Sequence, residues 1–328
     1  MKPLPILVAL LLAAITSASA ADPDALMQGV KRIVFLGDSI TYAGGYVDIL
    51  EATFRAAHPD QAIEFLDIGL PSETVSGLSE PGHAGGRFPR PTVHERLDRV
   101  LAKTKPDLLV ACYGMNCGMY YPLSDERFAK YREGIELFRK KAVAAGAKVI
   151  HLTPPVFDAV PIKGRTLPAG LAEYKQPFEG YNTVLDRYSE WLISQRAQGW
   201  LVVDTHSPMA KHLATERQRD PAYRLAGDGV HINGTGHWLI AREVLREFKG
   251  PEDKLAEAKD GSAFLAAIHP RGAELLKLIA ERQAVMKDAW LTECEHLRPG
   301  MKKGLPVAEA QAKWTELEAK IAEVAKAK

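Results

Sequence analysis

The feature that most constrains the fold is a regular alternation of short apolar runs with longer helical segments between residues 32 and 248. Runs rich in β-branched and aromatic residues predict five buried strands, at 32–36, 62–68, 108–113, 148–152 and 200–204. The segments between and after them predict helices at 44–57, 93–104, 125–145, 178–196 and 234–248. Strands that alternate with helices form a parallel sheet with helices on both faces. We therefore expect an α/β fold, a three-layer α/β/α sandwich around a five-stranded parallel sheet.

The composition is that of a globular protein and gives no support for several classes of function. The chain has 328 residues, 46% of them hydrophobic and 25% charged, with a formal net charge of +1. A nearly neutral chain without a basic run gives no indication of nucleic-acid binding. The histidines and Cys112, Cys117 and Cys294 match no zinc spacing, so we expect no metal and no other cofactor. Cys112 and Cys117 are near enough in sequence to pair, although two buried thiols are the expectation we prefer.

The first twenty residues predict a secretory signal peptide. Lys2 supplies a positive charge, residues 6–15 are an apolar stretch, and Ala18-Ser19-Ala20 form a small-residue cleavage site. The apolar stretch is shorter than a membrane-spanning helix needs, although an uncleaved anchor is the alternative. We therefore expect residues 1–20 to be removed and the mature chain to be exported, periplasmic or extracellular, with no integral membrane span.

The composition changes after Gly250-Pro251. Residues 251–328 are rich in Ala, Glu, Lys and Leu, and they predict two long helices, at 271–297 and 307–327. We therefore divide the mature chain into an α/β domain, residues 21–250, and a C-terminal helical extension, residues 251–328. The helical pair either packs on the α/β domain or acts as a lid or partner-binding element, and the sequence does not separate the two.

Polar residues follow the first three predicted strands and are expected at one edge of the sheet. Gly37-Asp38-Ser39-Ile40 comes directly after the first strand, Gly69 ends the second, and Asn116 follows the third. The carboxyl edge of an open parallel sheet is where ligands bind. A helix that begins beside Ser39 would favour negative charge there. Asp38 is interpreted as a turn residue.

Serine-based acyl transfer is the chemistry that these residues predict together with Asp228-Gly229-Val230-His231. A carboxylate three residues before an imidazole can accept its Nδ1–H, which leaves Nε2 free to take a proton from a serine. Ser39 is therefore the predicted nucleophile, His231 the base and Asp228 its orienting partner. The predicted oxyanion hole consists of the backbone N–H groups of Ser39 and Gly69 and the side-chain amide of Asn116.

Three other residues were weighed for the same roles. His206 follows the fifth predicted strand but lacks a carboxylate three residues earlier, so we expect it to be structural. His237 is expected to be a partly buried helix residue. Cys117 is a rival nucleophile, but no cationic residue is near it in the sequence to lower its pKa.

These segments resemble the four blocks of the SGNH, or GDSL-type, hydrolase superfamily of esterases and lipases. Gly37-Asp38-Ser39-Ile40 matches the first block, Gly69 the second, Gly114-Met115-Asn116 the third and Asp228-Gly229-Val230-His231 the last. The resemblance spans residues 32–250 and implies a flavodoxin-like sandwich and a metal-independent Ser-His-Asp mechanism, with Ser39, Gly69 and Asn116 as the oxyanion hole. Cys117 stands where the family usually has aspartate, and Asp67 stands where it often has asparagine.

The predicted function is that of a secreted serine esterase which removes short acyl groups, most plausibly acetate, from carbohydrate or related alcohols. The third block, with Lys105-Pro106-Asp107 before its strand, resembles that of secreted bacterial members which are often associated with acetylated carbohydrate. A lysophospholipase or lipase is one alternative, and a catalytically inactive glycan- or ligand-binding protein is the other. Substrate-binding residues are not predicted individually. Five aromatic residues are candidates for stacking on sugars or for the core: Tyr113, Tyr120, Tyr121, Trp191 and Trp238.

Overall fold

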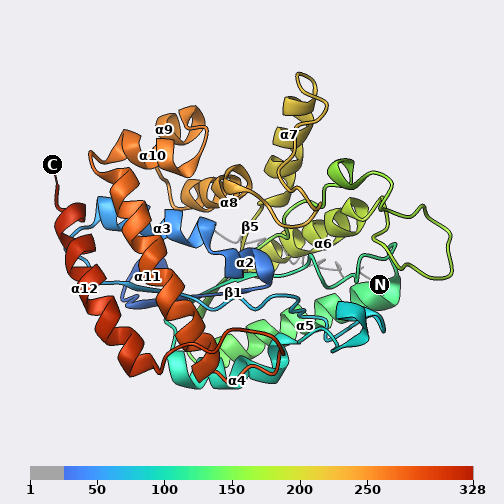
Figure 1. Ribbon diagram of the computed structural model, residues 1–328, viewed down its shortest axis with the longest axis horizontal. Helices are drawn as coiled ribbons and strands as arrows, with labels where there is room; N and C mark the ends of the chain where they lie inside the picture. The colour runs from blue at the N-terminus through green and yellow to red at the C-terminus, as the bar shows by residue number, and fades with distance from the viewer. Residues whose placement is uncertain (1–25, 328) are drawn as a thin grey trace, which may run out of the picture.

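The computed structural model describes residues 26–327, and its centre is a sheet of five parallel strands (Figure 1). The strands lie in the order β2-β1-β3-β4-β5 and span Arg32–Gly37 (β1), Glu64–Asp67 (β2), Leu108–Cys112 (β3), Lys148–Leu152 (β4) and Leu201–Val203 (β5). The predicted fold class is therefore confirmed. The predicted signal peptide, residues 1–20, lies outside the described residues.

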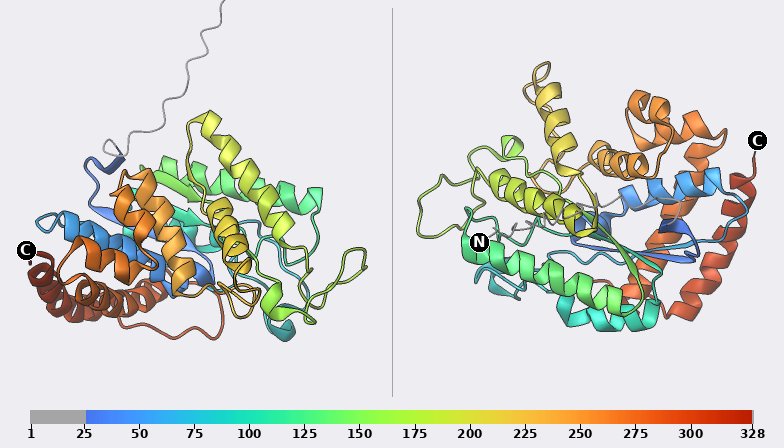
Figure 2. Two further views of the ribbon diagram at one scale, coloured as in Figure 1. Left: turned by 90° about the horizontal axis from the view of Figure 1, so that it is seen from above. Right: turned by 180° about the vertical axis from the view of Figure 1, so that it is seen from behind.

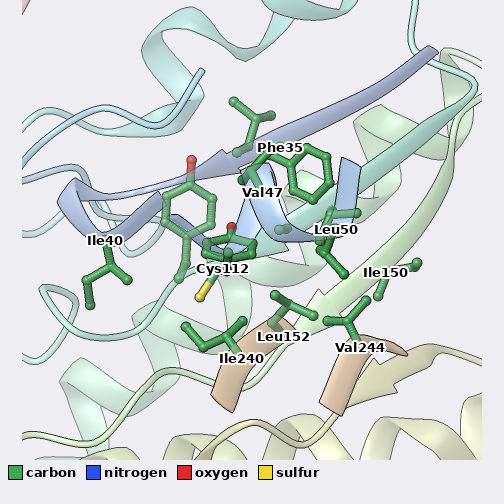
Figure 3. Packing of buried hydrophobic residues seen from close by; sticks show 14 of the residues in the cluster. Phe35, Ile40, Val47, Leu50, Cys112, Ile150, Leu152, Ile240 and Val244 are labelled. Carbon is green, nitrogen blue, oxygen red and sulfur yellow. The ribbon is translucent and has the colours of Figure 1, made fainter. Parts of the chain in front are cut away.

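Helices cover both faces of the sheet, which explains why the strands are continuous apolar runs. One layer contains α3 and α8, and the other contains α4, α5 and α6 (Figures 1 and 2). These helices span Gly45–Ala57 (α3), Val93–Thr104 (α4), Asp125–Ala144 (α5), Asn182–Ser194 (α6) and Gly234–Glu247 (α8). In Figure 3, side chains from α3 and α8 point toward the strands around Phe35 of β1, among them Val47, Leu50, Ile240 and Val244. The three-layer sandwich thus has a large apolar core on the α3 side.

The C-terminal extension packs against α3 and against the edge strand β2. Its helices span Glu252–Glu257 (α9), Gly261–Ile268 (α10), Gly272–Glu293 (α11) and Val307–Ala325 (α12). Leu275, Ile279 and Met286 recur at helical spacing on α11 and are buried, as an amphipathic helix that docks on a core requires. Figure 2 shows α11 and α12 side by side at the β2 end of the molecule.

Several helices differ from the sequence prediction. The helix predicted at 178–196 begins only at Asn182, after a loop that contains Gly180, and a separate short 3₁₀ turn follows it. Within residues 26–327, four α-helices were not predicted: α2 (Ser39–Ala43), α7 (His206–Arg217), α9 and α10. Three of them are eight residues or shorter, and α7 buries only three side chains, so none has a long apolar stripe. Within residues 26–327, no helix is both long and apolar enough to cross a membrane.

Candidate active site

Ser39 is presented at the end of β1 by a tight strand-to-helix turn. Gly37 is required there because a Cβ atom on it would lie 2.0 Å from the Thr41 hydroxyl oxygen. The Asp38 side chain caps α2 by accepting a hydrogen bond of 2.9 Å from the backbone N–H of Ile40. Ser39 is consequently the first residue of α2, and its own backbone N–H has no intrahelical partner.

Asp38 is buried beneath this turn, close to several charged residues. Burial raises the pKa of Asp38 to about 6, while the hydrogen bond from the Ile40 N–H and the proximity of His231 and Arg90 oppose that rise. Asp38 is therefore structural, as the sequence indicated, and its specific role is to cap α2. Asp38 also lies close enough to His231 and Arg90 for both residues to affect its pKa.

The side chains of Ser39, His231 and Asp228 form a continuous hydrogen-bonded chain. His231 Nε2 lies 2.8 Å from Ser39 Oγ, and His231 Nδ1 lies 2.6 Å from Asp228 Oδ2. With a proton on Nδ1, the imidazole donates to Asp228 and leaves Nε2 to accept from the Ser39 hydroxyl. Ser39 and His231 are 192 residues apart in the sequence, so the fold brings them together.

The turn at 228–231 holds the carboxylate in place for His231. Asp228 Oδ1 accepts hydrogen bonds from the backbone N–H groups of Val230, at 3.0 Å, and His231, at 2.8 Å. Gly229 has a φ of +83°, and a Cβ atom there would lie 2.7 Å from the carbonyl oxygen of Asp158. Partial burial alone would raise the pKa of Asp228, but the hydrogen bonds from His231 and Val230 bring the pKa below its ordinary value. Asp228 is thus held as a carboxylate.

Gly69 packs directly against α2. A Cβ atom on Gly69 would lie 2.4 Å from the backbone nitrogen of Tyr42, so no other residue fits there without displacing the helix. The Gly69 N–H, one of the predicted oxyanion donors, donates to Asp67 Oδ1 at 3.0 Å. Asp67, which stands where the resemblance leads us to expect asparagine, thus provides the acceptor oxygen for this N–H. Burial raises the pKa of Asp67 to about 6, and Lys287 of α11, 3.8 Å away, opposes the rise.

Asn116 lies in the loop after β3 and is almost fully buried. Its Nδ2 donates to the backbone carbonyl of Glu73 at 3.3 Å. Its Oδ1 accepts from Arg90 Nη1 and from the Tyr120 hydroxyl, each at 3.0 Å. Arg90 was missed by the sequence analysis, and Tyr120 was considered for sugar stacking or for the core but not as a partner of Asn116.

A buried ionic group supports the loops that carry Gly69 and Asn116. Arg96 of α4 contacts both carboxylate oxygens of Glu73, at 2.7 and 2.8 Å, and both side chains are fully buried. The Tyr113 hydroxyl donates to Glu73 at 2.7 Å, and Arg96 also donates to the carbonyl of Ile68. These bonds tie the end of β3 to the loop after β2 and fix the carbonyl that Asn116 contacts. Tyr113 is therefore a core residue.

The rival residues occupy other environments. Both ring nitrogens of His206 are engaged, Nδ1 by the Pro154 carbonyl at 2.9 Å and Nε2 by Asp186 at 2.8 Å. His237 is buried in α8 and stacks on Tyr46. All three cysteines are buried free thiols, and burial raises the pKa of Cys117 to about 11. Its sulfur lies 3.4 Å from the backbone N–H of Val75, an acceptor position that a carboxylate would also fill.

The comparisons with known proteins agree with this architecture. A family model described as the GDSL-like Lipase/Acylhydrolase family matches residues 35–239, more than half of the chain. No curated protein sequence matches the chain. Among solved structures, the acetylxylan esterase Axe2 from Geobacillus stearothermophilus is 20% identical, with a TM-score of 0.50. That match covers 67% of this chain and 95% of Axe2.

A second solved structure is a gut microbial diltiazem-metabolizing enzyme, 20% identical with a TM-score of 0.48. The match covers 66% of this chain, and the chain spans only 46% of that protein's length. The family model spans Ser39, Gly69, Asn116, Asp228 and His231. The protein described here belongs to the GDSL-like lipase/acylhydrolase family and is a carboxylic ester hydrolase of the SGNH type.

Proposed function

We propose that the protein is a serine esterase that hydrolyses short-chain oxygen esters, above all acetyl esters, by a Ser-His-Asp mechanism. The observation that carries the proposal is the hydrogen-bonded chain from Asp228 through His231 to Ser39, with contacts of 2.6 and 2.8 Å. A serine hydroxyl becomes an effective nucleophile when an adjacent base removes its proton, and this chain has the required order.

In the proposed reaction Ser39 Oγ attacks the ester carbonyl while His231 Nε2 takes its proton. The imidazolium that forms is stabilised by Asp228 and then protonates the departing alcohol. A water molecule, activated by the same histidine, hydrolyses the acyl-enzyme. The backbone N–H of Ser39 and the Asn116 amide stabilise the oxyanion. The Gly69 N–H is the third proposed donor, and it divides its hydrogen bond between Asp67 and the oxyanion. Losing one such donor typically raises the barrier by about 3–4 kcal/mol.

The proposed substrates are acetylated carbohydrates, and the resemblance in fold to an acetylxylan esterase supports this class. We expect kcat/KM for p-nitrophenyl esters to fall about tenfold or more from acetate to octanoate, because the proposed preference for acetyl esters requires an acyl site that excludes the longer chain. Acetate release from acetylated xylan is the matching test on carbohydrate. Faster turnover of octanoate than of acetate would instead favour the lipase or lysophospholipase alternative.

The rate of hydrolysis is expected to rise between pH 5 and pH 8, the range in which imidazoles in general change charge, because only a neutral imidazole can act as the base. Asp228 does not produce this rise, since its lowered pKa keeps it ionised over the whole range. The pKa of Asp38, which burial raises to about 6, falls in the same range. The control is Asp38→Asn, which keeps an N-cap acceptor but has no ionisable proton. A profile that is flat in the wild type, or that loses its rise in this variant, would contradict the assignment to His231.

We further propose that residues 1–20 are a signal peptide, that residues 21–250 form the hydrolase domain, and that the mature protein is periplasmic or extracellular. The basic residue, the apolar stretch and the Ala-Ser-Ala site near residue 20 support export. Expression of the full-length chain in a bacterium tests this directly. Mass spectrometry of the secreted or periplasmic protein should find a mature N-terminus near Ala21.

A further inference from the structure

The amide oxygen of Asn116 is held by two hydrogen-bond donors. Arg90 Nη1 and the Tyr120 hydroxyl each lie 3.0 Å from Asn116 Oδ1. An amide oxygen has two lone pairs, so both are used by these contacts. On the other side of the group, Nδ2 donates to the backbone carbonyl of Glu73 at 3.3 Å. The amide is therefore fixed at both ends by groups that come from different loops.

The chemistry of these partners allows only one orientation of the amide. A guanidinium can only donate and a backbone carbonyl can only accept, so a flipped Asn116 would face Arg90 with its NH₂ group and Glu73 with its oxygen. Both contacts would then be lost inside a buried site, which is costly. In the observed orientation one N–H of Nδ2 is used by Glu73, and the second N–H is available to an oxyanion.

Arg90 is itself rigidly held. Its Nε and Nη2 contact the two carboxylate oxygens of Glu80, each at 2.7 Å, and its side chain is only 6% exposed. Its backbone N–H donates to the Ser79 hydroxyl at 2.9 Å. Two parallel bonds fix the plane of a guanidinium as well as its position. The remaining nitrogen, Nη1, is the one that contacts Asn116.

Tyr120 is placed over Arg90 by a strained segment of backbone. Met119 and Tyr120 have φ values of 57° and 59°, which non-glycine residues rarely adopt. The Arg90 guanidinium lies over the Tyr120 ring, 5.4 Å from its centre. Burial raises the pKa of Tyr120 well above its ordinary value, so the hydroxyl keeps the proton that it donates to Asn116. Strain of this kind persists where the surrounding structure requires it and is frequent at active sites.

We propose that Arg90 is a positioning residue that holds the Asn116 amide in its donor orientation and polarises it toward the oxyanion. A positively charged guanidinium that donates to the amide oxygen withdraws electron density from the amide nitrogen and makes the free N–H a stronger donor. The inference rests on the proposed function, because it assumes that Asn116 contacts the oxyanion. Arg90 acts through Asn116, with Tyr120 as the second donor to the same oxygen.

A double-mutant cycle between Arg90 and Asn116 tests the proposal. We expect Asn116→Ala to lower kcat by about 10²- to 10³-fold and Arg90→Met to lower it by about 10-fold or more, with little change in KM. Because Arg90 acts through Asn116, the double variant should be no slower than Asn116→Ala alone. Thermal unfolding of each variant verifies that the protein is folded.

Three further variants keep the test decisive if Arg90→Met is unstable. Tyr120→Phe removes one donor to Asn116 but keeps the ring, and should lower kcat by a smaller factor. Arg90→Lys should recover part of the loss because one donor and the charge remain. Tyr174→Phe removes a hydroxyl that bonds to the backbone of its own exposed loop and should leave kcat unchanged.

The contrary outcomes separate the positioning role of Arg90 from the proposed oxyanion hole. Multiplicative losses in the double variant, or a loss seen mainly in KM, would show that Arg90 acts independently of Asn116 and would overturn its positioning role alone. An unchanged kcat in Arg90→Met would do the same. An unchanged kcat in Asn116→Ala would overturn the proposed oxyanion hole and the role of Arg90 with it.

Discussion

Ser39→Ala will lower kcat/KM for p-nitrophenyl acetate by about 10⁶-fold while leaving the protein folded. The variant removes the atom that is proposed to form the acyl-enzyme and keeps the backbone N–H that begins α2. The Ser39 hydroxyl lies at the edge of the sheet, where its side-chain contact is with the exposed His231. Its loss therefore opens no cavity in the core, and the unfolding temperature should stay within a few degrees of the wild-type value.

A fluorophosphonate probe provides the complementary measurement. Such a probe reacts with a serine that an adjacent base has activated, so it should label Ser39 in the wild type and label nothing in Ser39→Ala. Ser207→Ala is the matched control, since Ser207 is exposed beside His206, the rival histidine. Failure to label the wild type would support the inactive-binding alternative. Label found on a serine other than Ser39 would place the chemistry elsewhere.

The strands and long helices could be predicted because their signals are local. The helix at 93–104 has a threonine cap, a clear apolar stripe and a lysine at its C-terminal end, and the observed α4 begins and ends at the predicted residues. Helix α7 was not predicted because its only buried side chains are His206, Met209 and Leu213, too few for a recognisable apolar stripe. Helix α9 has six residues, which is too short for periodicity to be read.

The candidate site likewise contains some residues that a local sequence pattern indicates and others that it does not. Asp228 and His231 were recognisable because one short turn joins them, and Ser39 because it follows a strand and precedes a helix. Arg90 contacts Asn116 across 26 residues, from an irregular loop with no periodic pattern. This contact forms only when the two loops come together in the folded protein, so no local sequence pattern indicates it. The same holds for Lys287, whose position beside Asp67 becomes visible only when α11 docks on the edge of the sheet.

The link between the extension and the α/β domain includes a buried cluster of four alternating charges. Glu51 and Arg55 of α3 face Arg282 of α11 and Glu318 of α12. Arg282 contacts Glu51 directly, and its Nη1 lies 2.7 Å from Glu318. Gln283 donates to the same oxygen of Glu51 at 2.8 Å. Glu51 and Arg282 are 0% and 2% exposed in their side chains, so water cannot replace a partner that is removed.

Arg282→Met will therefore lower the free energy of unfolding by about 3 kcal/mol, because it leaves the buried Glu51 carboxylate with a more distant cation, Arg55 at 3.6 Å. Urea unfolding followed by circular dichroism measures the loss. The matched control is Arg271→Met, which breaks exposed pairs with Glu274 and Glu323 and should leave the free energy of unfolding nearly unchanged. The double variant Glu51→Gln, Arg282→Met should recover part of the loss, because no unpaired charge then stays buried. A loss below 1 kcal/mol for Arg282→Met, or no recovery in the double variant, would show that this cluster does not hold the extension to α3.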